Sequence, residues 1–106
     1  MIKIIEDNIE ELRAICKESS VAELYLFGSA VSGKFTDDSD LDFAVLFAKS
    51  LSPLKHGDAF FSQKEDLENL FGCEIDLLSY RVVKNTIFKE ELDRTKIALY
   101  ATKKSA

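Results

Sequence analysis

The stretch LFGSAVSGKFTDDSDLDF, residues 26–43, decides the fold of this chain. The β-favouring run 21–27 ends at a glycine, and residues 40–47 alternate, with Leu41, Phe43, Val45 and Phe47 on one face. Between them, 28–34 reads as a tight turn leading into one or two helical turns, and 35–39 as a polar loop. The stretch therefore predicts two successive strands whose connection carries small and polar residues.

Outward from this stretch, helical and strand patterns alternate along the chain. Periodic apolar residues predict a helix over 3–18, and a second over 59–71 with Asp58 as N-cap, a loop over 50–57 before it and Gly72 at its end. The remaining patterns predict a strand over 74–79, a helix over 82–94 with Val83, Ile87 and Leu92 inward, a strand over 97–101 and a frayed tail over 103–106. The fold class is therefore α/β (α+β): one two-layer domain over 1–106, with a small mixed sheet of about four strands and helices on one face.

Composition limits the function classes. The 106 residues carry 19 acidic and 14 basic side chains, a net charge of −5, which argues against binding long nucleic acid alone. No apolar run approaches the ~20 residues of a membrane span, and the start turns acidic too early for a signal peptide. Cys16 and Cys73 form no paired motif and His56 is the single histidine, so free thiols in a reducing cytoplasm are expected and a zinc site is not.

Three aspartates form the candidate catalytic group. Asp40 and Asp42 lie two apart in a predicted strand and so share a face, about 6.6 Å apart along the chain. Such carboxylates repel unless a cation lies between them, and hard oxygen ligands suit Mg²⁺. Asp76, in the strand over 74–79, would join them if the two strands are neighbours. Three carboxylates can hold two metal ions, the arrangement used for in-line phosphoryl displacement.

Gly28 and Ser29 are the candidate phosphate-binding residues. A glycine after a strand lets backbone N–H groups approach an anion, and the serine hydroxyl adds a donor. Lys34 can add positive charge nearby. The spacing differs from the G-x-x-x-x-G-K-[ST] nucleotide loop, so that class is not indicated.

Together these residues resemble a known family. Leu26-Phe27-Gly28-Ser29, ten intervening residues, Asp40-Leu41-Asp42-Phe43 and then Ile75-Asp76-Leu77-Leu78 look like the minimal nucleotidyltransferases of the DNA polymerase beta-like superfamily. That pattern is h-G-S, a spacer, D-h-D-h and a third acid on a later strand. The resemblance covers about residues 20–101, nearly the whole chain.

The resemblance implies roles for each matching position. Gly28 and Ser29, helped by Lys34, would hold ATP or another nucleoside triphosphate; Asp40, Asp42 and Asp76 would bind two Mg²⁺ ions; and Asp76 would assist deprotonation of the acceptor hydroxyl. Small members of the family act as antitoxins that adenylylate a tyrosine of a HEPN-type helical toxin. A chain this short has no room for an acceptor domain, so the acceptor is expected on another molecule.

One position departs from the family pattern. Many relatives carry Arg where this chain has Ser32, and Lys34 is the nearest substitute, although Lys lacks the Arg fork. A binding module that has lost turnover, acting as antitoxin or transferase subunit by complex formation, therefore stays open as the alternative. A small-molecule nucleotidyltransferase is a third hypothesis, and it would need an acceptor domain that this chain lacks.

Overall fold

A computed structural model describes residues 2–36, 38–48 and 51–102. Four strands form one mixed sheet in the order β3-β2-β1-β4: β1 (Val21–Phe27), β2 (Leu41–Phe47), β3 (Ile75–Ser79) and β4 (Ile97–Ala101). β1 runs antiparallel to β2 and β4, and β2 runs parallel to β3. The predicted fold class, a small mixed sheet with covering helices, is confirmed.

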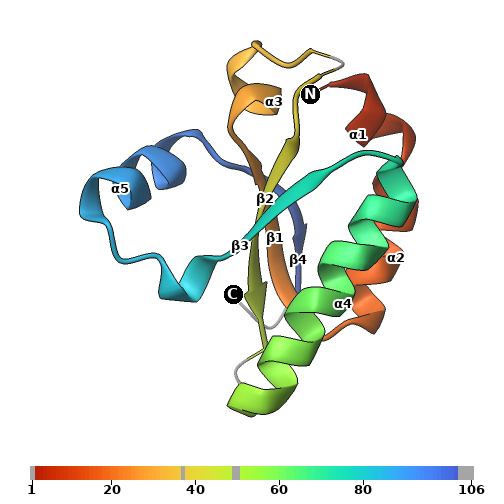
Figure 1. Ribbon diagram of the computed structural model, residues 1–106, viewed down its shortest axis with the longest axis vertical. Coiled ribbons are helices and arrows are strands. Elements are labelled where there is room, and N and C mark those ends of the chain that lie inside the picture. The colour runs from red at the N-terminus through yellow and green to blue at the C-terminus, as the bar shows by residue number, and fades with distance from the viewer. Residues whose placement is uncertain (1, 37, 49–50, 103–106) are drawn as a thin grey trace.

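Three helices cover one face of the sheet (Figure 1): α1 (Lys3–Asp7), α2 (Ile9–Glu18) and α4 (Pro53–Phe71). Leu41, Phe43 and Val45 point to this face and are fully buried. The ring of Phe43 stacks on Phe71 of α4 with centroids 5.7 Å apart, which fixes the facing of β2. The alternation seen in the sequence therefore does place the apolar side of β2 in the core.

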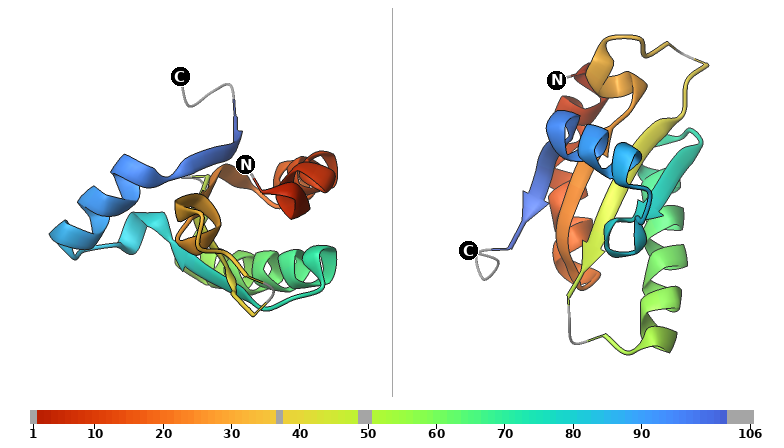
Figure 2. Two further views of the ribbon diagram at one scale, coloured as in Figure 1. Left: turned by 90° about the horizontal axis from the view of Figure 1, so that it is seen from above. Right: turned by 90° about the vertical axis from the view of Figure 1, so that its left-hand side faces the viewer.

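The opposite face of the sheet is covered only in part, by two short segments. The short 3₁₀ turn η1 (Tyr80–Val82) and α5 (Thr86–Thr95) lie on this side, away from α2 and α4 (Figure 2). Tyr25 of β1 contacts Tyr80, and Phe27 contacts Phe88, with ring centroids 5.7 and 6.1 Å apart. We call this side the open face. The sequence predicted helices on one face of the sheet, and α5 differs because it lies on the open face.

The first predicted helix is interrupted. The backbone leaves helical geometry at Asn8 (φ −119°, ψ 12°), which separates α1 from α2. The Asn8 side-chain amide donates to the Ile4 carbonyl at 2.9 Å. Such local side-chain bonding competes with the helix ladder, so an asparagine inside an apolar period produces a bend that the period alone does not reveal.

The prediction of a loop over 50–57 and of Asp58 as an N-cap was wrong. α4 begins at Pro53, and the Ser52 hydroxyl caps it by accepting from the Lys55 N–H at 3.3 Å; Ser50 lies outside the described residues. Proline fits the first helical position because its missing N–H would be unbonded there. Gly72 ends α4 in a left-handed conformation, as predicted.

The last helix starts later than predicted, and its inward face differs. α5 begins at Thr86 because the Asn85 side chain accepts from the Phe88 N–H at 2.9 Å, while the segment before it is η1. Ile87, expected inward, is 81% exposed, whereas Leu92 is 2% exposed. The tail over 103–106 lies outside the described residues.

Both cysteines are free thiols, as expected, with Cys16 in the core. Cys16 accepts a hydrogen bond from the buried Gln63 amide at 3.6 Å, and burial raises the pKa of this thiol to about 11. Within the part of the chain that the structure describes, no helix is both long and apolar enough to cross a membrane.

An aromatic and charged cluster holds η1 and α5 against the open face. Tyr25 and Tyr80 lie side by side, and the Lys96 ammonium lies 5.0 and 5.6 Å from their ring centroids. Tyr80 donates to Asp93, which raises the pKa of Tyr80 to about 12, and Lys96 pairs with Asp93 at 3.1 Å. The cluster therefore joins β1, η1, the end of α5 and the start of β4.

Replacing Lys96 tests this cluster. Lys96→Met keeps the apolar stem but removes both cation–π contacts, so we expect the free energy of unfolding to fall by about 1 kcal/mol. Urea unfolding followed by circular dichroism measures it. Lys3→Met is the matched control, because Lys3 makes only an exposed ion pair with Asp7. Equal stability of the two variants would show that the ring contacts contribute nothing.

Candidate active site

Two strands place Asp42 and Asp76 side by side on the open face. In the antiparallel pairing of β1 with β2, Asp42 lies opposite Phe27, and in the parallel pairing of β2 with β3, Asp42 lies beside Asp76. Directly paired residues point to the same face of a sheet, so both carboxylates face away from the core. The strand neighbourhood that the sequence analysis required for Asp76 is therefore present.

Gly28 lies in direct contact with Asp42. It has φ 74° and ψ −146°, a combination nearly confined to glycine, and it links β1 to the short helix α3 (Ser29–Ser32). A Cβ built on Gly28 would overlap the Asp42 carboxylate and lie 3.0 Å from its Cγ. The missing side chain thus lets the turn approach the carboxylate closely.

The electrostatics of the pair are unfavourable without a cation. Partial burial, the neighbouring charge of Asp76 and a hydrogen bond between the two carboxyl groups raise the pKa of Asp42 to about 6, with a smaller contribution from Asp40. A bound cation would offset the repulsion between the two carboxylates. Because Mg²⁺ is bound through one or two carboxylates plus substrate phosphates, the pair fits that ion when nucleotide is present.

Asp40 lies outside the strand pairing that joins Asp42 to Asp76. It precedes the first residue of β2, is exposed, and its charge also acts on the Cys73 thiol, raising the pKa of that group after the larger effect of burial. Among residues 2–36, 38–48 and 51–102, no three acidic, histidine or cysteine side chains converge on one point as metal ligands would. The structure therefore brings together two of the three predicted acids.

The predicted phosphate-binding residues flank α3: Gly28 and Ser29 lie at its start, and Lys34 lies beyond its end. Ser29 is its first residue and is half-buried, directly after Gly28. Lys34 is exposed two residues beyond Ser32, the last residue of α3, and its backbone N–H donates to the Ser29 carbonyl at 3.2 Å. Ser32, at the position of the family Arg, is exposed on α3 and donates to the same carbonyl at 3.4 Å.

Two cavities open beside the acid pair. One of about 280 Å³ is lined by Asp42, Asp76 and Phe27 together with Leu77 and Leu78. The other, about 460 Å³, lies between α3 and α5, and we call it the α3–α5 pocket; its apolar lining includes Phe27, Val31, Phe88 and Leu92. Phe27 lines both cavities, so they adjoin along its ring.

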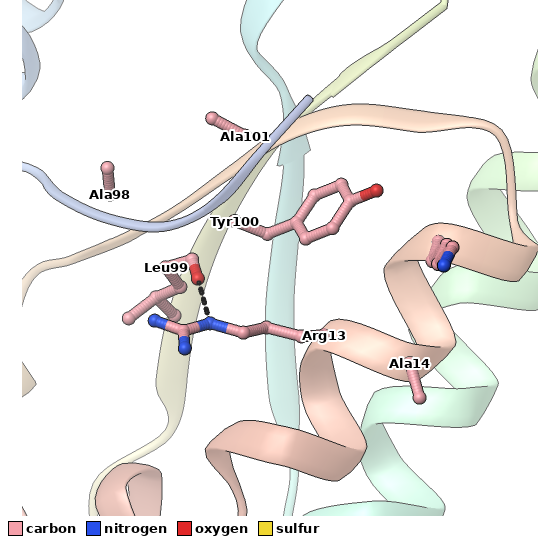
Figure 3. A pocket seen from close by; sticks show the side chains of 7 residues that line it. Arg13, Ala14, Ala98, Leu99, Tyr100 and Ala101 are labelled. Atoms are coloured by element: carbon pink, nitrogen blue, oxygen red, sulfur yellow. Dashed lines mark hydrogen bonds between the residues drawn. The ribbon is translucent and has the colours of Figure 1, made fainter. Parts of the chain in front are cut away.

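Other cavities lie away from the acids. One of about 510 Å³ lies between α2 and β4, where Arg13 Nε donates to the Leu99 carbonyl at 3.1 Å and Tyr100 faces the same space (Figure 3). Its lining contains no carboxylate. The hydrogen bond from Arg13 joins α2 to β4, so Arg13 has a structural role in this cavity.

The sequence analysis missed the aromatic residues of the site. Phe27 was assigned to a strand and to the family motif but given no role in the site, and Phe88 was not singled out. The signal was present in α5, where Phe88, Leu92 and Thr95 recur at helical spacing, but the wrong helix start placed Ile87 on the inner face instead.

A glycine–serine turn against a carboxylate pair, on a mixed four-stranded sheet, defines a site for transferring nucleotidyl groups. A family model described as polymerase beta, nucleotidyltransferase, matches residues 10–105. The chain belongs to this family and is a nucleotidyltransferase, which confirms the resemblance drawn from the sequence.

Individual proteins of known name or structure are also similar to this chain. The protein adenylyltransferase MntA of Thermococcus cleftensis is 36% identical over 89 residues, which are 84% of this chain and 83% of that protein. A crystal structure of a toxin–antitoxin with AMP-PNP superposes with a TM-score of 0.70 at 23% identity, over 92% of this chain and 77% of that one. A tri-AMPylated HEPN toxin from Shewanella oneidensis in complex with MNT antitoxin gives 0.63 at 20% identity, over 94% and 75%. The two structures show the fold.

Proposed function

We propose that this chain, as one nucleotidyltransferase domain over 1–106, transfers AMP from ATP to a tyrosine hydroxyl of a HEPN-type toxin and thereby acts as its antitoxin. The observation that carries the proposal is the carboxylate pair of Asp42 and Asp76 in contact with the Gly28 turn. The adenylyltransferase name of the relative from Thermococcus cleftensis and the HEPN complexes among the solved structures support it.

The arrangement suits an in-line displacement at phosphorus. Gly28 and Ser29 would hold the triphosphate, with Lys34 close enough in the chain to add charge. The acceptor oxygen forms a bond to the α-phosphorus, the bond to the β-phosphate oxygen breaks, and pyrophosphate leaves. Asp76, which lies beside Asp42 in the paired strands, would take the hydroxyl proton as a general base.

Asp42 and Asp76 would hold Mg²⁺, with Asp40 as a further ligand. Bound there, the ions would stabilise negative charge on the attacking and leaving oxygens. The side chains contribute the hard oxygen ligands, and the phosphates complete the coordination. Two ions are proposed, by analogy with the paired-metal arrangement of phosphoryl-transfer sites.

Label transfer tests the proposal. The chain is mixed with the HEPN-type protein encoded by the adjacent reading frame, where one is present, and with α-labelled ATP. We expect Mg²⁺-dependent label on the partner, lost with EDTA and lost when the acceptor tyrosine is changed to Phe. A stable complex without label would favour the alternative, a binding module, for which Ser32 in place of Arg is the motivating feature.

A further inference from the structure

The α3–α5 pocket has no role in the catalytic chemistry described above. It is lined on one side by Gly28 and Val31 and on the other by Phe88, Leu92 and Thr95 of α5. These three α5 residues lie at i, i+4 and i+7, on one stripe of the helix. Such a stripe normally packs directly on its neighbour, yet here a space of about 460 Å³ separates it from α3.

We propose that the α3–α5 pocket binds the nucleobase of the donor nucleotide by stacking and does not discriminate strongly between bases; this rests on the proposed function. The pocket begins at Gly28, where the phosphates would lie, and its volume is in the range of small-ligand sites. A nucleotide can therefore span from the acid pair past Phe27 into this space.

Aromatic rings supply the stacking surface. Phe27 and Phe88 meet edge to face with centroids 6.1 Å apart, and Phe88 is still 39% exposed. The Phe88 N–H donates to the Asn85 side chain, and this capping bond fixes the start of the helix that carries the ring. An exposed but positioned aromatic ring beside a phosphate-binding turn is what a planar base requires.

The polar side chains of the pocket are engaged elsewhere. Both Glu91 carboxylate oxygens accept from Arg94, at 2.6 and 2.7 Å, and the Thr95 hydroxyl donates to the Glu91 carbonyl at 2.7 Å. Ser32, the remaining polar lining residue, donates to the Ser29 carbonyl. With these groups occupied, the edge of the base meets few directed hydrogen bonds, and every base offers a face for stacking.

Binding measurements separate the base from the phosphates. Isothermal titration with Mg²⁺ compares ATP with inorganic tripolyphosphate for the wild type, Phe88→Ala and Ile87→Ala. Ile87 is the matched control, because it precedes Phe88 on the same helix, is 81% exposed and does not line the pocket. We expect Phe88→Ala to weaken ATP binding about tenfold and to leave tripolyphosphate binding unchanged, whereas Ile87→Ala changes neither.

Base tolerance is measured in the same assay. We expect the dissociation constants of ATP, GTP, CTP and UTP to agree within about tenfold. A preference above about tenfold for one base would overturn the tolerance, and equal weakening of ATP and tripolyphosphate by Phe88→Ala would overturn the pocket assignment. Phe88→Ala that leaves ATP binding intact but raises the KM of the protein acceptor would assign the pocket to the acceptor instead.

Failure of the proposed function gives a different result. If neither ATP nor tripolyphosphate binds the wild type in Mg²⁺, the nucleotidyl-transfer site itself is contradicted. If tripolyphosphate binds as tightly as ATP, the phosphate site stands and only the base pocket is contradicted.

Discussion

Asp42→Asn is expected to abolish nucleotidyl transfer, by at least a thousandfold, while making the metal-free protein more stable at neutral pH. The amide keeps the shape of the side chain and can still hydrogen-bond to Asp76. It removes the carboxylate that contacts Gly28 and lies beside Asp76, and that would help to hold Mg²⁺. Activity and stability therefore change in opposite directions, as at sites where like charges are held together for function.

The sign of the stability effect follows from the raised pKa of Asp42, about 6 against an ordinary value of 3.8. Between these values the folded state binds more protons than the unfolded state, so stability falls as pH rises from about 4 to about 6. The full shift corresponds to about 3 kcal/mol, and solvent screening at this half-exposed group reduces it to about 1 kcal/mol. Asp42→Asn removes this loss.

Urea unfolding in EDTA at pH 4 and pH 7.5 measures this pH dependence of the free energy of unfolding. We expect Asp42→Asn to match the wild type at pH 4 and to exceed it by about 1 kcal/mol at pH 7.5. Glu65→Gln, an exposed substitution on α4, is the control and should follow the wild type at both pH values and retain activity. Transfer activity within tenfold of wild type in Asp42→Asn would contradict its metal-binding role.

Gly28→Ala is expected to cost both stability and activity, more than any other glycine substitution in the site region. A Cβ at this position would overlap the Asp42 carboxylate, with Asp42 Cγ and Cβ only 3.0 and 3.2 Å away. The backbone, at φ 74° and ψ −146°, is also strained for alanine. We expect the free energy of unfolding to fall by about 2–3 kcal/mol and nucleotide transfer to fall at least a hundredfold.

Gly33→Ala is the matched control for this prediction. Gly33 also has a positive φ, 83°, but nothing lies within 4 Å of a Cβ built on it. It should therefore lose about 1 kcal/mol from backbone strain alone and keep its activity within about threefold. If both variants lose activity equally, the loop conformation, and not the contact with Asp42, controls the site.

The sequence by itself determined the core of β1 and β2 and the family. Alternating Leu41, Phe43 and Val45 gave a correct facing because a strand has a period of two whatever its neighbours are. The spacing from Gly28 to Asp42 identified the nucleotidyltransferase pattern, and the pairing of β2 with β3 then placed Asp76 where the pattern required it.

Helix boundaries were harder to predict from the sequence, because capping side chains decide where a helix begins. A single side chain caps the start of each of two helices. With Ser52 as the cap, α4 begins at Pro53, six residues before the predicted start at 59. With Asn85 as the cap, α5 begins at Thr86, four residues after the predicted start at 82. The start of α5 matters most for function. It brings Phe88, rather than Ile87, to the pocket beside the acids.

Only the tertiary structure decided which acids meet and what covers them. Asp40 and Asp42 look equivalent in the sequence, yet only Asp42 is paired within the sheet, beside Asp76 and against Gly28. The α3–α5 pocket is likewise invisible in the sequence, because it is formed by segments some 60 residues apart that the Tyr25–Tyr80–Lys96 contacts hold on the open face. Local pattern fixes the period of an element, whereas long-range packing fixes its neighbours, and the site is made of neighbours.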